Sequence, residues 1–263
     1  MLKLVNVCKT FNAGTINERK ALIDVNLQLN EGDFITVIGG NGAGKSTMLN
    51  AIAGLWPIDS GAIFINDTNV TGMPEHVRAK YIGRVFQDPM MGTAPDMQIE
   101  ENLALAKRRG QSRGLKSGIT GKERSEYKEL LKSLDLGLED RLTSKVGLLS
   151  GGQRQAVTLL MASLKKPDLL LLDEHTAALD PKTAKKVLEI SENIIREHNL
   201  TALMVTHNMK DAIAYGNRLI MMSEGKIIYD VSGEEKKNLK VSDLLQKFEE
   251  AGNDEVNDAM VLS

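Results

Sequence analysis

The sequence predicts an α/β fold in which helices cover both faces of a mainly parallel β-sheet. Short apolar runs alternate with stretches of helical periodicity, which is typical of parallel strands joined by helices. An alternating apolar and polar pattern near the N-terminus predicts an antiparallel β subdomain. The absence of a convincing strand from Pro89 to Lys145 predicts an inserted helical subdomain over about 89–165. The chain has 263 residues, 42% of them hydrophobic, enough for one large domain with a subdomain.

The first elements are expected close to the N-terminus. Alternating residues predict half-buried strands at Leu2–Val7 and Ala21–Leu29, joined by the polar loop Asn12–Lys20. Asp33–Ile38 is a nearly continuous apolar run, which predicts a strand buried on both faces. Glycines follow this strand, and a helix is expected over Lys45–Ala53.

Strands and helices then alternate to the end of the main domain. Strands are expected at Ile82–Phe86, Leu169–Leu172, Ala202–Thr206, Leu219–Met222 and Lys226–Tyr229, the last two as a hairpin. Helices are expected at Ile99–Arg109, Lys122–Leu134, Gly151–Leu164, Pro181–His198 and Met209–Tyr215. Proline is tolerated in the first turn of a helix, so Pro181 after the capping residue Asp180 marks a helix start.

Residues 1–232 are expected to form one domain, and residues 233–263 an acidic C-terminal extension. The extension is predicted to carry one short amphipathic helix, with Val241, Leu244, Leu245 and Phe248 on one face. From Gly252 onwards the chain is expected to fray.

Charge and hydropathy exclude several classes of protein. Lysine and arginine number 33 against 35 acidic residues, a net charge of −2, which argues against binding to nucleic acid through bulk positive charge. No apolar stretch approaches the ~18–20 residues of a membrane-spanning helix. The N-terminus lacks a secretory signal, so the protein is expected to be intracellular. The basic stretch Lys107–Arg124 has two interpretations: a solvated loop, or a contact with anionic lipid headgroups or a membrane partner.

A glycine-rich loop carries the first strong functional signal. Residues 39–47, Gly-Gly-Asn-Gly-Ala-Gly-Lys-Ser-Thr, satisfy G-x-x-x-x-G-K-[ST] between a buried strand and a helix, the context that a phosphate-binding loop (P-loop) requires. Such a loop points backbone N–H groups at phosphate oxygens, and the helix N-terminus adds about half a positive charge. We expect Lys45 to bridge the β- and γ-phosphates and Ser46 to ligate Mg²⁺. The candidate nucleotide-binding residues are Gly39, Asn41, Gly42, Ala43, Gly44, Lys45, Ser46 and Thr47.

Adjacent carboxylates end a second buried strand, because Asp173 and Glu174 follow Leu169–Leu172. Parallel strands deliver such residues to the edge of the sheet where α/β proteins bind ligands. Neighbouring strand residues point to opposite faces, so the chain must turn on leaving the strand to bring both to one site. Asp173 fits a metal role, holding a Mg²⁺-bound water, and Glu174 fits the role of orienting and polarising the attacking water.

A second anion-binding site is predicted at the string Leu-Ser-Gly-Gly-Gln, residues 149–153. Ser150 is an expected helix N-cap, and Gly151 and Gly152 leave backbone N–H groups uncovered at the helix start. On its own the pattern also fits an ordinary capped helix. One γ-phosphate does not need two anion sites from the same chain.

Together these motifs resemble the nucleotide-binding subunit of an ATP-binding-cassette (ABC) transporter. The resemblance covers about residues 1–230 and rests on the P-loop, Gln87, the Leu-Ser-Gly-Gly-Gln string, Asp173-Glu174, the turn Ala178-Leu179-Asp180 and His207, in matching order and spacing. It implies an ATPase with a P-loop NTPase core that uses ATP and Mg²⁺ at the cytoplasmic face of the cell membrane. It also implies three kinds of partner: a second copy or a homologous ATPase, integral membrane permease subunits and, indirectly, a substrate-binding lipoprotein. Nucleic acid is not among them.

The resemblance further implies residue roles. Two subunits of this family pair head to tail, and each ATP lies between the P-loop of one and the Ser-Gly-Gly helix of the other. Ser150, Gly151, Gly152 and Gln153 would contact the ATP of the other subunit, with Asp180 communicating across the interface. The implied catalytic residues are Glu174, His207 and Gln87, the implied metal ligands are Ser46, Gln87 and Asp173, and Phe11 stands where an aromatic stacks on adenine.

The chain departs from the usual family pattern at His175, at residues 156–161 and at residues 88–95. No catalytic group is lost, so ATP hydrolysis is expected. The departures favour a group of bacterial importers that work with a lipoprotein-type binding protein, some of them linked to uptake of aromatic amino acids. Two alternatives stay open: the ATPase of an exporter or lipid/lipoprotein-extraction system, which the first strand pair and its loop resemble, and a soluble ABC ATPase outside transport.

Overall fold

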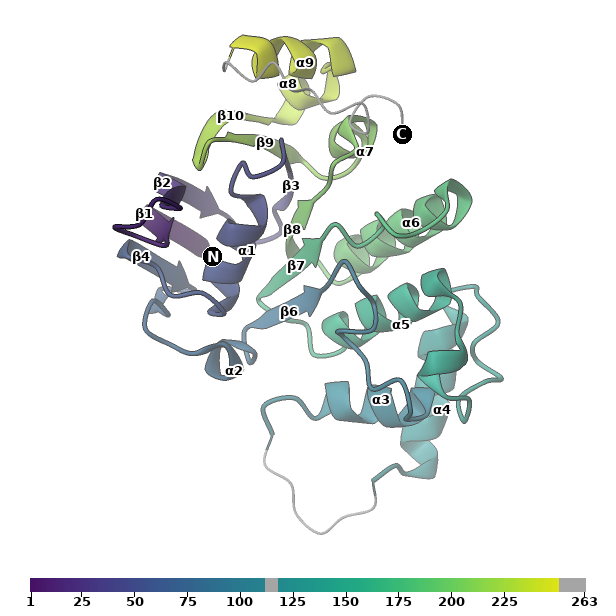
Figure 1. Cartoon of the computed structure of the whole chain (residues 1–263). Helices are drawn as coiled ribbons and strands as arrows, with labels where there is room; N and C mark the ends of the chain where they lie inside the picture. Colours follow the sequence, from purple (N-terminus) through teal and green to yellow (C-terminus); the bar gives the residue numbers. More distant parts are fainter. Residues whose placement is uncertain (112–117, 251–263) are drawn as a thin grey trace.

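Figure 1 shows a central β-sheet with a smaller antiparallel sheet on one side and a group of helices on the other. The computed structural model describes residues 1–111 and 118–250 of the chain. The predicted fraying from Gly252 onwards lies outside these residues, as does the middle of the basic stretch.

The central sheet has six strands in the order β10-β9-β3-β8-β7-β6. They are β3 (Phe34–Gly39), β6 (Ile82–Val85), β7 (Leu169–Asp173), β8 (Thr201–Val205), β9 (Arg218–Ser223) and β10 (Lys226–Ser232). The pairs β3–β8, β3–β9, β7–β8 and β6–β7 are parallel, whereas β10 runs antiparallel to β9. The prediction of a mainly parallel sheet is therefore confirmed.

This strand order gathers the predicted motifs at one edge of the sheet. The C-terminal ends of parallel strands meet at the same edge, where α/β proteins bind ligands. The P-loop follows β3, Asp173 ends β7, and Gln87 and His207 come just after β6 and β8.

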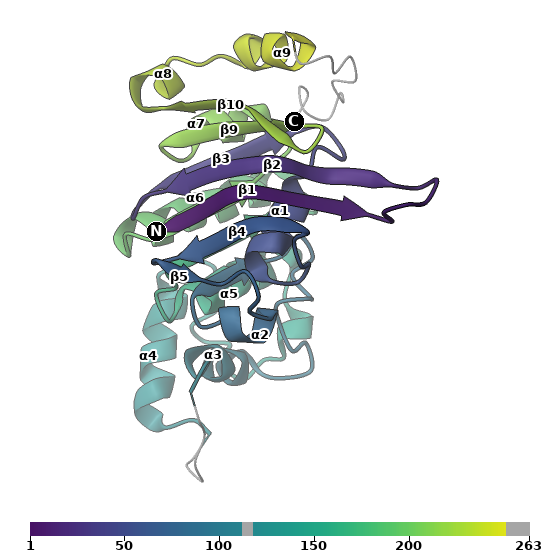
Figure 2. The same cartoon turned by 90° about the vertical axis from the view of Figure 1, so that its left-hand side faces the viewer.

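The antiparallel sheet has the order β2-β1-β4-β5. Its strands are β1 (Leu2–Phe11), β2 (Arg19–Leu29), β4 (Ser60–Ile65) and β5 (Thr68–Asn69). The first pair is longer than predicted and extends beyond the rest of the molecule (Figure 2). Strands β4 and β5 have no clear sequence pattern, because both are short and exist through the pairing of β4 with β1 and of β5 with β4.

Helices fill the space around the two sheets (Figure 1). They are α1 (Lys45–Ala53), α2 (Glu75–Arg78), α3 (Ile99–Lys107), α4 (Gly121–Lys132), the 3₁₀ helix η1 (Val146–Leu148), α5 (Gly151–Ser163), α6 (Pro181–Glu197), α7 (Met209–Ala214), α8 (Gly233–Lys237) and α9 (Val241–Glu250). The one-turn elements α2 and η1 are not predicted, because they are too short to show a helical period.

Strand β7 separates two apolar cores because successive side chains of a strand point to opposite faces. Leu170 and Leu172 pack with the helices α3 to α6. Leu169 and Leu171 pack with α1 and the antiparallel sheet. All four side chains are fully buried, as a strand covered on both faces requires.

The described part of the C-terminal extension differs from its prediction. It holds two helices, α8 and α9, rather than the single helix expected. The five residues of α8 are too few for an apolar period. The apolar stripe of α9 is as predicted: Leu244 and Phe248 are buried in a cluster with Met209 and Ala212 of α7.

The basic stretch is tied to acidic side chains where the structure describes it. The ion pairs are Lys107–Glu126 at 2.6 Å, Arg108–Glu123 at 2.7 Å and Arg124–Glu100 at 2.6 Å. The first two join the end of α3 to α4, and the third joins α4 to the first turn of α3, so the described ends of this stretch hold the helical subdomain together.

Candidate nucleotide-binding site

The P-loop has the geometry that its glycines predict. Gly44 is the N-cap of α1 with φ 104°, a conformation that L side chains rarely adopt. A Cβ atom there would also lie 2.5 Å from the carbonyl oxygen of Ala21. Only glycine therefore lets the chain turn into α1 against the neighbouring strand.

Lys45 is held inside this loop. Lys45 is buried, with 5% of its surface exposed. Its Nζ donates hydrogen bonds to the carbonyl oxygens of Gly39 at 2.7 Å and Gly40 at 3.1 Å. Burial lowers the pKa of Lys45, while the nearby carboxylates of Glu174 and Asp173 oppose this effect. A phosphate at this place would offer the ammonium stronger, charged acceptors than two carbonyl groups do.

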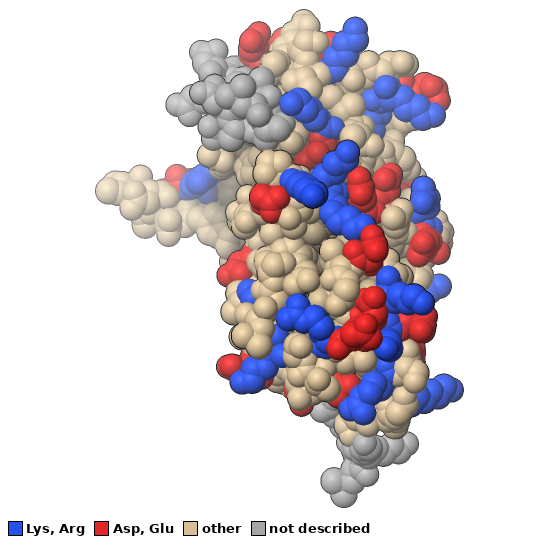
Figure 3. All heavy atoms as spheres, turned by 90° about the vertical axis from the view of Figure 1, so that its right-hand side faces the viewer, with Lys and Arg blue, Asp and Glu red and all other residues tan. Residues whose placement is uncertain are grey.

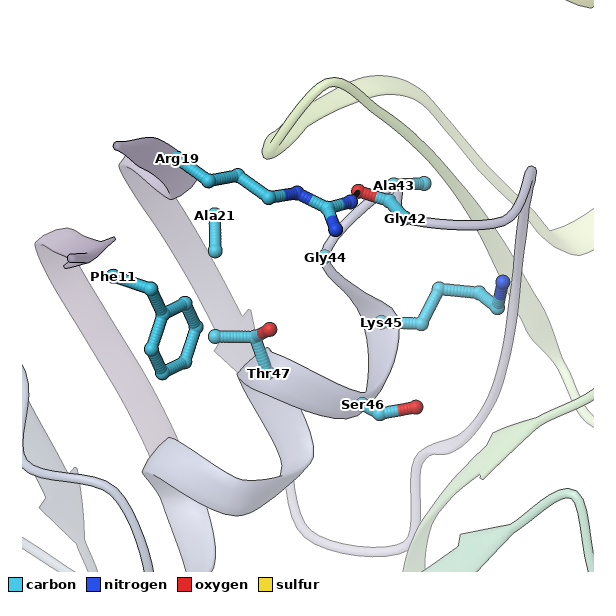
Figure 4. A pocket seen from close by; sticks show the side chains of 9 residues that line it. All are labelled: Phe11, Arg19, Ala21, Gly42, Ala43, Gly44, Lys45, Ser46 and Thr47. Atoms are coloured by element: carbon cyan, nitrogen blue, oxygen red, sulfur yellow. Dashed lines mark hydrogen bonds between the residues drawn. The ribbon is translucent and has the colours of Figure 1, made fainter. Parts of the chain in front are cut away.

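A cavity of about 190 Å³ opens beside the P-loop and is lined by Phe11, Arg19, Ala21 and residues 42–47. Figure 4 shows the Arg19 guanidinium reaching over the loop to Gly42 and the Phe11 ring lying beside Thr47, both from the antiparallel sheet. Phe11 packs edge-on against Trp56 with ring centroids 5.0 Å apart, and Arg19 Nη2 donates to the Gly42 carbonyl at 2.7 Å. Phe11 thus lies with the P-loop residues, as an adenine-stacking role requires; Arg19 was not predicted.

Glu174 and His207 form a close pair at the sheet edge. His207 Nε2 lies 2.5 Å from Glu174 Oε1. Glu174 has φ 45°, a left-handed conformation that is uncommon for a residue with a side chain and clusters at functional sites. This is the turn that the chain needs after β7. Burial acts to raise the pKa of Glu174, but His207 and Lys45 outweigh it and hold the pKa below its usual range.

Asp173 pairs with a residue that the sequence analysis missed. Arg84 Nη2 lies 3.1 Å from Asp173 Oδ2 and donates to Asn50 Oδ1 at 2.6 Å. Burial raises the pKa of Asp173, against the opposing charge of Arg84. A charged residue inside the apolar run Ile82–Phe86 was the signal available in the sequence.

The side-chain oxygen atoms at this edge of the sheet are suitable ligands for a magnesium ion. Among the described residues, no group of three or more His, Cys, Asp or Glu side chains could hold a metal. Mg²⁺ does not need such a cage, because it binds through one or two protein oxygens, substrate phosphates and water. The hydroxyl of Ser46, the amide of the exposed Gln87 and the carboxylate of Asp173 supply such oxygens.

The string at 149–153 forms a capped helix start away from the P-loop. Ser150 Oγ accepts from the Gln153 backbone N–H at 3.3 Å, and Gln153 Oε1 accepts from the Ser150 N–H. A Cβ on Gly152 would lie 2.0 Å from Thr183 Cγ2, and Asp180 caps α6 through the Thr183 N–H at 3.1 Å. The starts of α5 and α6 therefore lie together. Across the described chain, no hydrogen bond or ion pair joins residues 149–153 to the P-loop.

A second cavity, of about 730 Å³, runs from the sheet edge that carries Glu174 and His207 toward the start of α6. Its lining includes Asn41, Glu174, His207, Leu179 and Pro181. It places the turn before α6 next to the Glu174–His207 pair.

His175, a departure from the family pattern, lies outside the site. It is 2% exposed, and its Nε2 lies 2.9 Å from Ser191 Oγ on α6. Burial lowers its pKa to about 4. Its role is to pack the turn against α6.

Comparisons with known proteins agree with this geometry. The family model described as ABC transporter matches residues 22–177. A tyrosine transport ATP-binding protein of Clostridioides difficile (strain R20291) is 45% identical over 95% of this chain and 100% of its own length. A phosphonates import ATP-binding protein of Lactococcus lactis subsp. lactis (strain IL1403) is 37% identical over 89% of this chain and 94% of its own.

Solved structures of high similarity are ATP-binding cassettes. One is a dimeric cassette in a post-hydrolysis state bound to ADP and phosphate, with a TM-score of 0.75 and 33% identity over 88% of this chain and 98% of that chain. The chain therefore belongs to the ABC transporter family and is one of its ATP-binding, ATP-hydrolysing subunits.

Proposed function

We propose that this chain powers a bacterial importer of an aromatic amino acid of the tyrosine type. The observation that carries the hydrolytic part is the Glu174–His207 pair beside the buried Lys45. The transport part is supported by the 45% identity, over nearly the full length of both chains, to a tyrosine transport ATP-binding protein. The phosphonates and spermidine/putrescine import relatives support import as the direction.

The catalytic residues act on a water molecule and on the γ-phosphate. Glu174, ionised because its pKa is low, accepts a hydrogen bond from the attacking water and orients it. His207 fixes the direction of that carboxylate through the 2.5 Å contact. Lys45 exchanges its two carbonyl partners for phosphate oxygens. Mg²⁺, when bound near Ser46, Gln87 and Asp173, would neutralise charge on the phosphates.

The complete site is proposed to need two chains. The helix start at Ser150–Gln153 offers backbone N–H groups for an anion. Among the residues that the structure describes, no hydrogen bond or ion pair joins it to the P-loop of its own chain. A head-to-tail pair would bring it to the ATP held by the other P-loop, and Asp180 would lie near the same interface. The dimeric form of a solved relative supports this arrangement.

An exposed apolar patch marks the proposed contact with a membrane permease. The patch consists of Met91 and Leu148, which are 70% and 72% exposed. The segments that carry them run side by side, because the Gly147 N–H donates to the Pro95 carbonyl at 2.8 Å. The patch follows Gln87 in the chain, so a docking permease could influence the site.

No helix in the described ranges is long and apolar enough to cross a membrane. Separate membrane subunits would supply the transport path, and this chain would act at the cytoplasmic face of the membrane, with a binding lipoprotein as a further, indirect partner. Acidic and basic side chains are interspersed over the face in Figure 3, which does not favour a nucleic-acid-binding role on that face.

Reconstitution tests the transport proposal. The chain is purified with its proposed membrane permease and placed in proteoliposomes with the proposed binding lipoprotein. Tyrosine is expected to stimulate ATP hydrolysis and to accumulate inside the vesicles in an ATP-dependent way. A transporter with Glu174→Gln should show neither the stimulated hydrolysis nor the accumulation. Stimulation by a different solute, or ATP-driven export of lipid or lipoprotein, would overturn the substrate or the direction.

A further inference from the structure

Arg84 is a charged residue in a strand that is otherwise apolar. Its side chain is 11% exposed, and it stands in β6 three residues before Gln87. Its Nη2 atom donates to Asn50 Oδ1 at 2.6 Å and to Asp173 Oδ2 at 3.1 Å. One guanidinium thus connects α1, β6 and β7 at the sheet edge that carries the site.

The rest of this guanidinium is poorly satisfied. Nε and Nη1 are buried and find no hydrogen-bond partner among the described residues. The group also lies over the Phe86 ring, 4.6 Å from its centroid. Most buried polar side-chain atoms have at least one hydrogen-bond partner, so two buried guanidinium nitrogens without one are unusual. What Arg84 provides here is a positive charge beside Asp173.

We propose that Arg84 is the resident counter-ion of Asp173 and that Mg²⁺ arriving with ATP competes with it for this carboxylate. The inference rests on the metal role proposed above for Asp173. Two cations at one carboxylate repel each other, and they do so more strongly in a partly buried site than in water. Arg84 therefore adds to Lys45 in compensating the charge of Asp173 and weakens the binding of Mg²⁺. It is a positioning residue, since it acts through Asp173.

The test compares the affinity for a non-hydrolysable ATP analogue in Mg²⁺ and in EDTA by isothermal titration calorimetry. Arg84→Met keeps an unbranched apolar stem and removes the charge, so the ratio of the affinity in Mg²⁺ to the affinity in EDTA should rise about tenfold. Arg84→Lys is the matched control, because it keeps the charge and should keep the wild-type ratio. Arg84→Gln, a polar neutral variant, serves if Arg84→Met does not fold.

A ratio that stays constant or falls in the neutral variants would overturn the inference. Asp173→Asn distinguishes a failure of this inference about Arg84 from a failure of the proposed metal role of Asp173. If Asp173→Asn leaves the ratio unchanged, the metal role of Asp173 is wrong; if it lowers the ratio while the neutral Arg84 variants do not raise it, only the role of Arg84 is wrong.

Thermal melting without nucleotide gives a second readout. Arg84→Met should lower the melting temperature, because Asp173 loses its counter-ion, and adding Asp173→Asn should restore part of that loss. Additive losses in the double variant would contradict the pairing.

Discussion

Glu174 combines an uncommon backbone conformation with a partner, His207, that comes from another strand end. Replacing Glu174 by glutamine keeps the shape of the side chain and an acceptor for His207 but removes the carboxylate charge. ATP hydrolysis is expected to fall by about a hundredfold or more, while ATP binding is retained. Phosphate release and equilibrium binding measure the two effects, and size-exclusion chromatography should show an ATP-dependent dimer. Hydrolysis at the wild-type rate would remove Glu174 from the catalytic role.

His175 predicts a pH dependence of stability. Its pKa is lowered by burial to about 4 in the folded chain, against about 6.5 when unfolded. Between these values the unfolded chain binds a proton that the folded chain does not, so stability is complete above pH ~6.5 and falls as the pH drops toward ~4. This contribution reaches about 3 kcal/mol at most.

Urea denaturation from pH 7 to pH 4 checks the effect of His175. The free energy of unfolding of the wild type should fall more steeply with acidity than that of His175→Asn, which has no imidazole to take up a proton. The exposed His198 offers the matched control: His198→Asn should retain the wild-type profile. Parallel curves for the wild type and His175→Asn would contradict the prediction.

At the scale of elements, α8 secures the C-terminal extension to α7 through one buried lysine. Lys236 is 2% exposed, and its Nζ donates to the carbonyl oxygens of Ile213 at 3.0 Å, Tyr215 at 2.5 Å and Gly216 at 3.0 Å. These carbonyls close the end of α7, and α7 begins shortly after His207. The extension therefore supports the element that follows a proposed catalytic residue.

Lys236→Met removes the ammonium group that donates hydrogen bonds to the carbonyl oxygens of Ile213, Tyr215 and Gly216. The free energy of unfolding is expected to fall by about 2 kcal/mol, as measured by chemical denaturation. The neighbouring Lys237 pairs with Glu234 on the surface, so Lys237→Met should change stability by less than about 0.5 kcal/mol. Equal effects of the two substitutions would show that the buried contacts do not stabilise the extension.

At the scale of the whole molecule, the separation of Ser150 from Lys45 predicts complementation between defective chains. Ser150→Arg damages the helix start and Lys45→Ala damages the P-loop, so neither chain alone should hydrolyse ATP. In a head-to-tail pair of the two variants, one site combines the intact P-loop of the first with the intact helix start of the second. Differently tagged chains, purified as a mixed dimer, should therefore recover part of the wild-type ATPase rate.

The same arrangement makes the activity depend on protein concentration. The rate per chain should rise with concentration as dimers form, which a dilution series of the isolated subunit measures. A mixed dimer without activity, or a rate per chain that is constant on dilution, would contradict a site shared between two chains.

Local patterns in the sequence were sufficient to predict the P-loop turn, the capped helix starts and strand β7. The P-loop turns at Gly44 because only glycine fits there, and the capping residues Ser150 and Asp180 start their helices through N–H groups three residues further on. The apolar run of β7 likewise predicted a strand covered on both faces. In the two capped helices, the residues that fix the helix start lie within three positions of each other.

Only the tertiary structure could decide which distant residues meet. Arg84 contacts residues 34 and 89 positions away in the chain, β4 exists through its pairing with β1, and Lys236 caps a helix that precedes it by a whole hairpin. Such contacts leave no periodic or spacing signal, because their free energy is gained only when the sheets and helices pack. The sequence by itself therefore determined the fold class and the candidate motifs, whereas packing of the whole chain decided the charge partner of Asp173.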